Sequence, residues 1–341
     1  MNTMFLDACM GRRVSRTPVW LMRQAGRYLP QYMEVRSKYS FMELYKTPEL
    51  AAEVTLQPVD ILGVDAAILF SDILTPIEAM GMKLSFCPAP VFETPIRSMR
   101  DVDGLRMPDM ESDLSYVFKT VKLLQVALAD RVPLIGFGGA PFTLACYMVE
   151  GRGTKEFAQV RRMIYEAPEV FAALMETITE MSIAYLNAQI AAGVQAIQIF
   201  DTWGGILSPS DYEKYALPYS RRLISGLVRN GIPVIHFVKG SGGMLDVVKQ
   251  AGSDVIGLDW HVKLGRARDI LGADAAVQGN LDPTVLYAPQ HIIEAEVQRI
   301  LDENAGRPGH IFNLGHGILP TIPPDNVKFM VDCVHRLSCR S

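Results

Sequence analysis

Two arginines stand four residues apart near the start of the chain, in the segment PVWLMRQAGRYLP. Arg23 and Arg27 follow an apolar run and enclose Gln24, Ala25 and Gly26. A guanidinium is permanently charged and presents a planar fork of donors that matches a carboxylate. The simplest alternative is a surface loop or a structural ion pair. If the loop is partly buried, the two charges require carboxylate partners from the protein or from a ligand, because an unpaired buried charge is costly.

An aspartate and a histidine follow two later apolar runs. Asp72 lies in FSDIL, and His316 stands between two glycines in NLGHG. An aspartate at this place often only caps the next helix, and the helix-forming ILTPIEAM does follow it. The alternative is a carboxylate that accepts N–H donors or stabilises a developing cation. A histidine in a glycine-rich turn is expected to be exposed and functional, whereas His236, inside an apolar run, is expected to be a core residue with satisfied ring nitrogens.

The glycine-rich stretch GFGGAPFTLACYMVEG does not match a dinucleotide-binding loop. Pro141 stands where GxGxxG requires its third glycine, and no acidic residue follows at the usual distance. The stretch predicts a buried strand, a turn with close backbone approach, and a helix that carries Tyr147. A tyrosine there is by default a core residue with a satisfied hydroxyl. The uncharged segment 132–149 contains prolines and glycines that argue against a membrane-spanning helix.

Eight short apolar runs alternate with amphipathic segments such as 166–192 and 211–230, a pattern that predicts a single (β/α)8 TIM barrel. A doubly wound sheet is the alternative. The runs are 18–22, 65–70, 133–137, 196–200, 233–237, 255–258, 275–278 and 310–314.

Polar or glycine residues follow nearly every run, and in a barrel these strand ends converge on the face that carries the active site. They are Arg23, Ser71-Asp72, Gly138-Gly139, Asp201-Thr202, Lys239-Gly240, Asp259, 279–282 and 315–317. Segment 83–95 predicts an inserted hairpin, and no linker divides the single domain, 1–341.

The composition indicates an ordinary globular protein, with 49% hydrophobic and 21% charged residues and a net charge of −4. This charge argues against nucleic-acid binding. The five cysteines show no short pairing pattern, which favours reduced thiols in a cytoplasmic protein. The N-terminus has no continuous apolar region of the kind that a signal peptide contains.

RQAGR, FSDIL, GAPFTLACYMVEG and NLGHG, in this order, resemble the uroporphyrinogen decarboxylase family over essentially the whole chain. The resemblance implies a single-domain (β/α)8 barrel that forms a homodimer. It also implies removal of CO2 from the four acetate side chains of uroporphyrinogen III to give coproporphyrinogen III, in haem biosynthesis. No metal and no organic cofactor are implied.

Carried to this sequence, the resemblance implies that RQAGR binds the substrate, with Arg23 and Arg27 on its carboxylates. Asp72 would face the four pyrrole N–H groups and would be catalytic together with Arg23. Tyr147, Thr202 and His316 would line the same site, and some family members carry serine where this chain has Thr202. The chemistry agrees independently: a substrate with eight carboxylates needs fixed cations, and a carboxylate can stabilise the cationic ring formed during decarboxylation.

Two rival functions stay open at this point. Barrel relatives that transfer methyl groups from corrinoids to thiols need a zinc site of the His-x-Cys…Cys kind. No His-x-Cys occurs here, and His236 is followed by Phe237 and Val238. The second rival is a non-catalytic tetrapyrrole carrier, which would use the same arginines but would have no need of Asp72.

Overall fold

The central element is a parallel sheet, seen in a computed structural model that describes residues 3–86, 89–129 and 131–339. Its seven strands run in the order β1-β4-β5-β6-β7-β8-β9, and each pairs in parallel with its neighbour. They are β1 (Ala67–Ile68), β4 (Leu134–Gly139), β5 (Ala196–Asp201), β6 (Val234–Val238), β7 (Val255–Gly257), β8 (Ala276–Gln278) and β9 (His310–Ile311). Seven of the eight predicted runs therefore contain strands.

The eighth run closes the sheet into a barrel. Val19 forms a parallel bridge with Phe312, directly after β9. The backbone N–H of Phe312 donates to the carbonyl of Pro18 at 2.8 Å, and that of Trp20 donates to the carbonyl of Phe312 at 3.3 Å. On the other side, the N–H of Asp65 donates to the carbonyl of Val19 at 2.7 Å, next to β1. The predicted (β/α)8 barrel is confirmed, and the doubly wound alternative is wrong.

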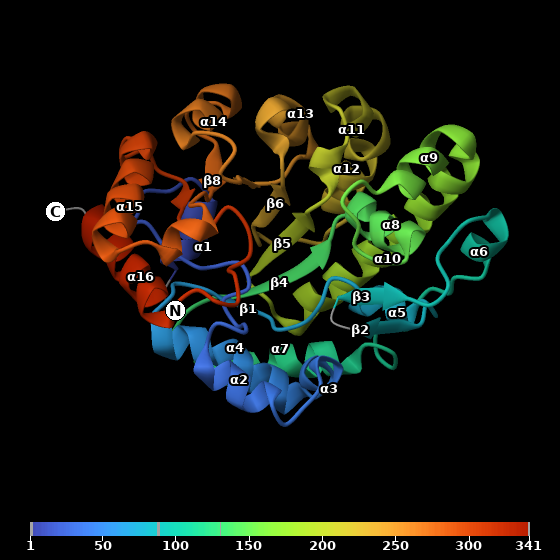
Figure 1. Ribbon diagram of the computed structural model, residues 1–341, viewed down its shortest axis with the longest axis horizontal. Coiled ribbons are helices and arrows are strands. Elements are labelled where there is room, and N and C mark those ends of the chain that lie inside the picture. Colours follow the sequence, from blue (N-terminus) through green and yellow to red (C-terminus); the bar gives the residue numbers. More distant parts are fainter. Residues whose placement is uncertain (1–2, 87–88, 130, 340–341) are drawn as a thin grey trace.

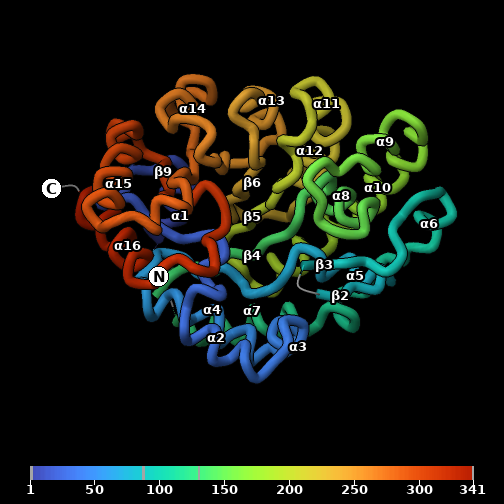
Figure 2. The backbone as a smooth tube through the Cα atoms, viewed as in Figure 1, coloured from blue at the N-terminus to red at the C-terminus, as the bar shows by residue number. Residues whose placement is uncertain are grey.

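The helices form a ring around the strands (Figure 1). The chain follows this ring once, so that its last helix returns beside the first large one, and α16 contacts α4 (Figure 2). The helices are α1 (Met4–Cys9), α2 (Pro30–Arg36), α3 (Phe41–Lys46), α4 (Pro48–Leu62), α5 (Thr75–Ala79), α6 (Met99–Asp103), α7 (Ser115–Leu128), α8 (Pro141–Glu150), α9 (Ala158–Glu166), α10 (Pro168–Ala192), α11 (Pro209–Tyr215), α12 (Leu217–Ser225), α13 (Leu245–Val248), α14 (Leu264–Leu271), α15 (Gln290–Asn304) and α16 (Pro324–Ser338), with short 3₁₀ turns at Gly204–Ile206, Ser241–Gly243, Lys249–Ala251 and Pro283–Tyr287.

Prolines explain several helix boundaries. Pro141 and Pro168 begin α8 and α10, where a missing N–H costs nothing. The segment 211–230, predicted as one helix, is instead divided into α11 and α12. The break falls at Ala216, because Pro218 stands in the first turn of α12 and cannot donate to a preceding carbonyl.

The predicted hairpin and the predicted close approach are both confirmed. Strands β2 (Leu84–Phe86) and β3 (Pro90–Phe92) pair antiparallel. In the glycine-rich strand β4, a Cβ added at Gly139 would lie 2.6 Å from Cδ2 of Leu144, so this glycine lets the side chain of Leu144 on α8 approach the strand closely.

Alternate side chains of the strands fill the barrel. Trp20 belongs to the buried cluster inside it, and α1 contributes Phe5 to the same cluster and contacts β8 and β9. A polar chain crosses this interior: Nε1 of Trp20 donates to Oε1 of Gln278 at 2.8 Å, and Nε2 of Gln278 donates to Oε1 of Gln198 at 3.1 Å. The barrel interior is therefore a packed core and not a channel.

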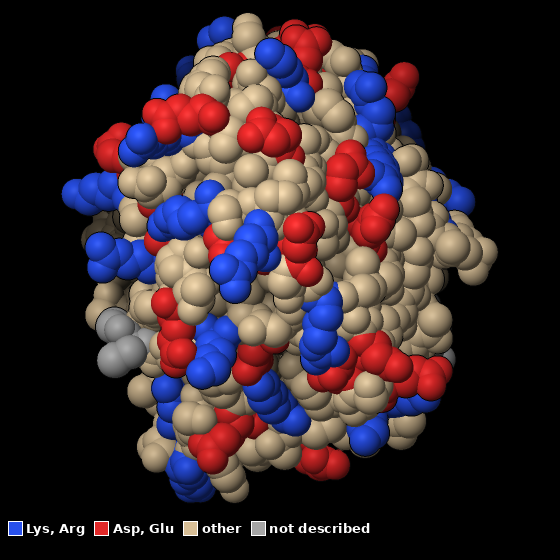
Figure 3. All heavy atoms as spheres, turned by 90° about the vertical axis from the view of Figure 1, so that its right-hand side faces the viewer, with Lys and Arg blue, Asp and Glu red and all other residues tan. Residues whose placement is uncertain are grey.

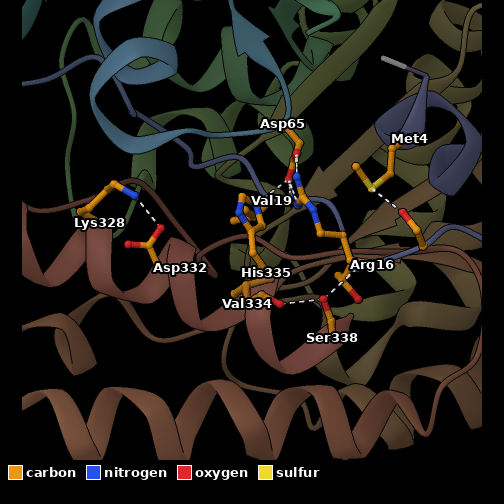
Figure 4. Close-up of polar contacts among 11 residues, drawn as sticks. Met4, Arg16, Val19, Asp65, Lys328, Asp332, Val334, His335 and Ser338 are labelled. Carbon is orange, nitrogen blue, oxygen red and sulfur yellow. Dashed lines mark hydrogen bonds and ion pairs between the residues drawn. The ribbon is translucent and has the colours of Figure 1, made fainter. Parts of the chain in front are cut away.

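A buried aspartate joins the two ends of the chain at the N-terminal edge of the strands (Figure 4). Asp65 accepts two hydrogen bonds from Arg16, at 2.8 and 2.6 Å, and one from the N–H of Val19 at 2.8 Å. Nε2 of His335, on α16, lies 2.9 Å from the same carboxylate. Because every polar group in this cluster is paired within the protein, we assign it a structural role.

His236 lies in the core as predicted, but neither of its ring nitrogens has a hydrogen-bond partner among the described residues, contrary to expectation. Burial lowers the pKa of its imidazole to about 4. The unfolded chain binds a proton there below roughly pH 6.5. Acid therefore favours the unfolded protein in the window between these two values.

We expect His236→Leu to make the free energy of unfolding less sensitive to acid. The ionisation of His236 leaves the free energy of unfolding of the wild type unchanged above about pH 6.5 and lowers it as the pH approaches 4. Removing His236 should abolish this loss, which amounts to up to about 3 kcal/mol. Urea unfolding at pH 7, 6, 5 and 4.5 measures the difference. The exposed His291, changed to Leu, is the control, and equal pH dependence of the two variants would contradict the assignment.

Four cysteines, Cys9, Cys146, Cys333 and Cys339, are unpaired thiols, and Cys87 lies outside the described residues. Lys and Arg are interspersed with Asp and Glu on the face shown in Figure 3, so that face carries no large patch of one sign. None of the helices in the described residues has the length and apolar character that crossing a bilayer would demand.

Candidate active site at the mouth of the barrel

The residues predicted to be functional lie at the C-terminal end of the barrel, here called its mouth. They come after the ends of strands or on the helix that follows one. Arg23 follows the closing segment, Asp72 follows β1, Thr202 follows β5 and His316 follows β9. Tyr147 lies on α8, the helix after β4. Arg23 is exposed and the others are half-buried. The charge of Arg23 acts on Asp72, Tyr147 and His316, so the structure brings these four residues into one electrostatic environment.

Arg23 has an unusual backbone. Its φ of 62° lies in the left-handed region, which non-glycine residues rarely adopt. Its side chain lies directly against the backbone of Gly317, where an added Cβ would collide with the arginine's aliphatic carbons. Such conformations persist where the surrounding structure enforces them, often at functional sites. The second glycine of NLGHG therefore leaves the space that the Arg23 side chain occupies.

This conformation gives a stability prediction that is separate from activity. Arg23→Gly is expected to be more stable than Arg23→Ala by about 1 kcal/mol. Both variants lose the arginine side chain. Adopting the left-handed conformation in the folded protein costs alanine about 1–2 kcal/mol, whereas the larger backbone entropy that glycine loses on folding costs roughly 0.5–1 kcal/mol. Denaturant unfolding of the two variants measures this difference. A less stable glycine variant would show that position 23 relaxes out of the left-handed region.

Gln24 holds the arginine loop in place. It is buried, its Oε1 accepts from the N–H of Leu21 at 3.1 Å, and its Nε2 donates to the carbonyl of Ala66 at 3.1 Å. The hydroxyl of Tyr28 donates to the carbonyl of Gln24 at 2.8 Å. The amide of Gln24 is thus committed to backbone groups, whereas Arg27 in the same motif is exposed.

Ala25 and Gly26 form the turn between the two arginines, and both are half-buried. An added Cβ at Gly26 would lie 2.9 Å from the carbonyl oxygen of Arg23. Glycine therefore allows the chain to fold back on the arginine's own backbone, which places both guanidinium groups in one short loop.

Asp72 makes a local turn and keeps one oxygen free. Its Oδ1 accepts from the N–H of Leu74 at 2.8 Å, just before α5. Its Oδ2 forms no hydrogen bond with any residue that the structure describes. Burial raises the pKa of this carboxyl, while the N–H of Leu74 and the charge of Arg23 lower it. The expectation that Asp72 caps the next helix is wrong, because the N-cap of α5 is Leu74 and no side chain of the described residues caps it. One oxygen of Asp72 instead holds the turn before α5, and the other remains available.

Thr202 is positioned by a buried network behind it. Oδ1 of Asp201 accepts from the Thr143 hydroxyl at 2.7 Å, and that hydroxyl in turn accepts from the N–H of Trp203 at 3.0 Å. The Tyr212 hydroxyl donates to Oδ2 of Asp201 at 3.3 Å. Burial raises the pKa of the Asp201 carboxyl to about 6. The loop that carries Thr202 is therefore fixed on both sides.

Tyr147 reaches the mouth from α8. Its ring packs edge-on against Trp203 and Phe157, at centroid distances of 6.1 and 6.4 Å. Burial raises the pKa of its hydroxyl, Asp72 adds to this effect, and Arg23 opposes it. Tyr147 therefore presents a neutral hydroxyl that senses the charges of both Asp72 and Arg23.

His316 is half-buried, which corrects the expectation that it is exposed. The cause is close packing, since a Cβ added at Gly315 would lie 2.6 Å from the backbone nitrogen of Trp260. Burial is the main cause that lowers the pKa of His316 to about 3, and the charges of Arg23 and Lys239 contribute to this shift. The imidazole is therefore neutral at physiological pH.

Sequence reasoning missed a row of aromatic rings that runs from β4 across β5 and β6 to His316, here called the aromatic floor. The rings of Phe137 and Phe200 lie 5.8 Å apart, those of Phe200 and Phe237 lie 6.4 Å apart, and that of His316 lies 6.2 Å from Phe237. Period-two alternation would have found them, because Phe200 is two residues before Thr202 on β5. Lys239, two residues after Phe237, was noted only as a polar strand end.

No three His, Cys, Asp or Glu side chains of the described residues are grouped so that they could hold a metal ion. The prediction that the reaction needs no metal and no cofactor stays a prediction.

Fold and site together define a (β/α)8-barrel protein with cations and an aromatic floor at the C-terminal ends of its strands, a combination that fits an anionic ligand with an apolar body. The chain belongs to the uroporphyrinogen decarboxylase family, whose model, described as "Uroporphyrinogen decarboxylase (URO-D)", matches residues 1–337. It is 72% identical over 338 residues to the uroporphyrinogen decarboxylase of Geobacter metallireducens, covering 99% of each chain. It is also 72% identical over 340 residues to that of Trichlorobacter lovleyi, covering 100% of each.

Among solved structures, a methyltransferase from Methanosarcina mazei is similar in fold, with a TM-score of 0.83, 21% identity and 98% of each chain covered. This likeness at low identity shows the barrel fold alone.

Proposed function

We propose that the protein is a carboxy-lyase that converts uroporphyrinogen III to coproporphyrinogen III by removing CO2 from its four acetate side chains. The full-length identity of 72% to proteins named uroporphyrinogen decarboxylase supports this activity. The structural observation that carries the proposal is Asp72, a half-buried carboxylate with a free oxygen in the field of Arg23. A carboxylate and a guanidinium that act on one another at the same end of the barrel suit a substrate with N–H donors at its centre and carboxylates at its edge.

In this proposal the arginine motif and the other residues at the mouth contact different parts of the substrate. Arg23 and Arg27 hold carboxylates of the substrate, and the side chains of Tyr147, Thr202 and His316 line the same site. Gln24, Ala25 and Gly26 belong to the motif through its backbone turn, with the Gln24 amide positioning the loop. The aromatic floor contacts the apolar face of the macrocycle.

The chemistry needs an electron sink, which the substrate supplies. A proton adds to a pyrrole carbon, and the resulting cation accepts the electron pair of the breaking bond between the acetate CH2 and its carboxylate. CO2 leaves, the exocyclic carbon takes up a proton to become a methyl group, and the ring carbon returns its proton. Each cycle therefore consumes one proton and releases one CO2. Asp72, facing the ring nitrogens, stabilises the cation by a preorganised charge.

The ionisation states of the residues at the mouth limit which group can donate the proton to the pyrrole carbon. His316 is neutral at physiological pH because its pKa is about 3, so it acts as a hydrogen-bonding group and not as an imidazolium acid. Burial raises the pKa of Tyr147 and makes its hydroxyl a weak acid. Arg23, a bound water molecule and Tyr147 are therefore the candidates for the proton donor.

The decisive experiment incubates the purified, chelator-treated protein anaerobically with uroporphyrinogen III, oxidises the products and counts their carboxylates by chromatography. Porphyrins with seven, six, five and finally four carboxylates are expected. Retention of all eight carboxylates would refute the activity, and activity that the chelator removes would refute the metal-free mechanism.

We further propose that the protein is a single-domain homodimer in the cytoplasm. The family resemblance supports the dimer, and the pattern of unpaired thiols supports the reducing compartment. Sedimentation equilibrium tests the dimer, with a mass near twice 37.8 kDa as the expected result and a monomer as the contrary one.

A further inference from the structure

Lys239 directly follows β6 at the mouth of the barrel. On this strand Ile235 and Phe237 belong to the cluster that fills the barrel interior. The N–H of Lys239 still donates to the carbonyl of Asp201, at 3.3 Å, so the ladder between β5 and β6 continues to this residue. Because side chains alternate along a strand, Lys239 continues the inward series one step above Phe237.

The ammonium group of Lys239 has no carboxylate within 4 Å among the described residues. Its Nζ lies 5.9 Å from the ring centre of Trp260. The carboxylate of Asp259, next to that tryptophan, is committed elsewhere: it accepts from the N–H of Gly240 at 2.5 Å and from the N–H of His261 at 2.9 Å.

The carboxylate of Asp201, on the neighbouring strand, is equally committed, since it is bonded to the hydroxyls of Thr143 and Tyr212. Lys239 is half-buried, where an unmatched charge is unfavourable unless a ligand supplies the counter-charge. Lys239 is thus a cation at the mouth of the barrel whose two neighbouring carboxylates, those of Asp201 and Asp259, are hydrogen-bonded to other groups.

The position of Lys239 complements that of Arg23. Counted around the closed barrel from the segment around Val19, β1, β4, β5 and β6 follow in order, which makes β6 the fifth of eight positions. Arg23 and Lys239 therefore rise from opposite sides of the barrel. Both act on the same histidine, His316. The two cations span the mouth, as anchors for a ligand that carries carboxylates around its whole edge would do.

We propose that Lys239 is a further substrate-binding residue, which holds a side-chain carboxylate of the tetrapyrrole across the mouth from Arg23. The inference rests on the proposed function and adds a second, opposed anchor to it. With both anchors in place the macrocycle is held at two edges, which fixes its centre over Asp72. A single cationic edge would allow the ring to pivot.

The test compares Lys239→Gln and Lys239→Arg with wild type and with Lys122→Gln, a control that removes an exposed lysine from the outer helix α7. Loss of one charge-assisted contact should raise KM for uroporphyrinogen on the order of tenfold in Lys239→Gln. kcat should change much less, Lys239→Arg should recover most of the affinity, and Lys122→Gln should behave as wild type. Thermal unfolding of each variant is recorded alongside.

A merely structural lysine over Trp260 predicts something else: a lower unfolding temperature with unchanged KM, and that outcome overturns the proposal. A fall in kcat at constant KM also overturns it. Anaerobic ultrafiltration with uroporphyrinogen measures binding without turnover. If wild type binds but does not decarboxylate, the proposed function fails, while weaker binding by Lys239→Gln still supports the anchor and equal binding refutes it.

Discussion

Replacing Asp72 with asparagine is expected to lower kcat on the order of 10²-fold or more while uroporphyrinogen still binds, by analogy with the loss of one preorganised stabilising group. Asparagine keeps an oxygen that can accept from the N–H of Leu74, so the turn before α5 persists and only the charge is lost. Single-turnover assays for the rate and anaerobic ultrafiltration for binding separate the two effects.

The same variant separates an enzyme from a tetrapyrrole carrier. A carrier has no cationic intermediate to stabilise, so it would retain its function in Asp72→Asn. Asp72→Ala is the companion variant, because it removes both the charge and the acceptor for Leu74. If the alanine variant unfolds more easily than the asparagine variant and both are equally inactive, the charge accounts for catalysis and the turn for stability. Full activity of Asp72→Asn would remove Asp72 from the mechanism.

Much of the fold could be predicted because its strands are buried on both sides. Such strands are apolar throughout, so runs like 196–200 stand out against the amphipathic helices between them. The limits of the prediction are equally physical. The closing strand is reduced to one bridge at Val19, and no local pattern shows that it pairs with Phe312. The contact between Asp65 and His335 joins residues that are distant in sequence, which no periodicity reveals.

The site was predicted in part from residue chemistry and in part from the family resemblance. Residue chemistry alone pointed to Arg23, Arg27, Asp72 and His316, because charged groups and a histidine directly after buried strands are candidates for binding or catalysis. Tyr147 and Thr202 came from the resemblance, since a helical tyrosine and a hydroxyl after a strand are ordinary. The burial of the site residues could not be predicted from the sequence. The low pKa of His316, for example, depends on the packing of its two flanking glycines against segments that are distant in sequence.

Removing either arginine is expected to weaken uroporphyrinogen binding or turnover while the fold stays intact. Arg23→Ala should have the larger effect, because Arg23 acts on Asp72, Tyr147 and His316 together, whereas Arg27 is an exposed member of the rim. We expect KM to rise on the order of tenfold for Arg27→Ala, as for one lost charge-assisted contact. Steady-state kinetics on both variants and on Arg13→Ala, an exposed control, measure this ranking.

An independent readout follows from His316, whose low pKa depends partly on Arg23. In Arg23→Ala the imidazole loses one repelling charge, so its pKa should rise toward the ordinary value, while Arg27→Ala should leave it unchanged. NMR titration of the histidine resonances shows this directly and does not depend on turnover. A rise in the His316 pKa together with weaker binding places Arg23 over the same mouth. Normal kinetics in both arginine variants would instead show that Arg23 and Arg27 belong to an ordinary surface loop. Other residues would then have to bind the carboxylates of the substrate.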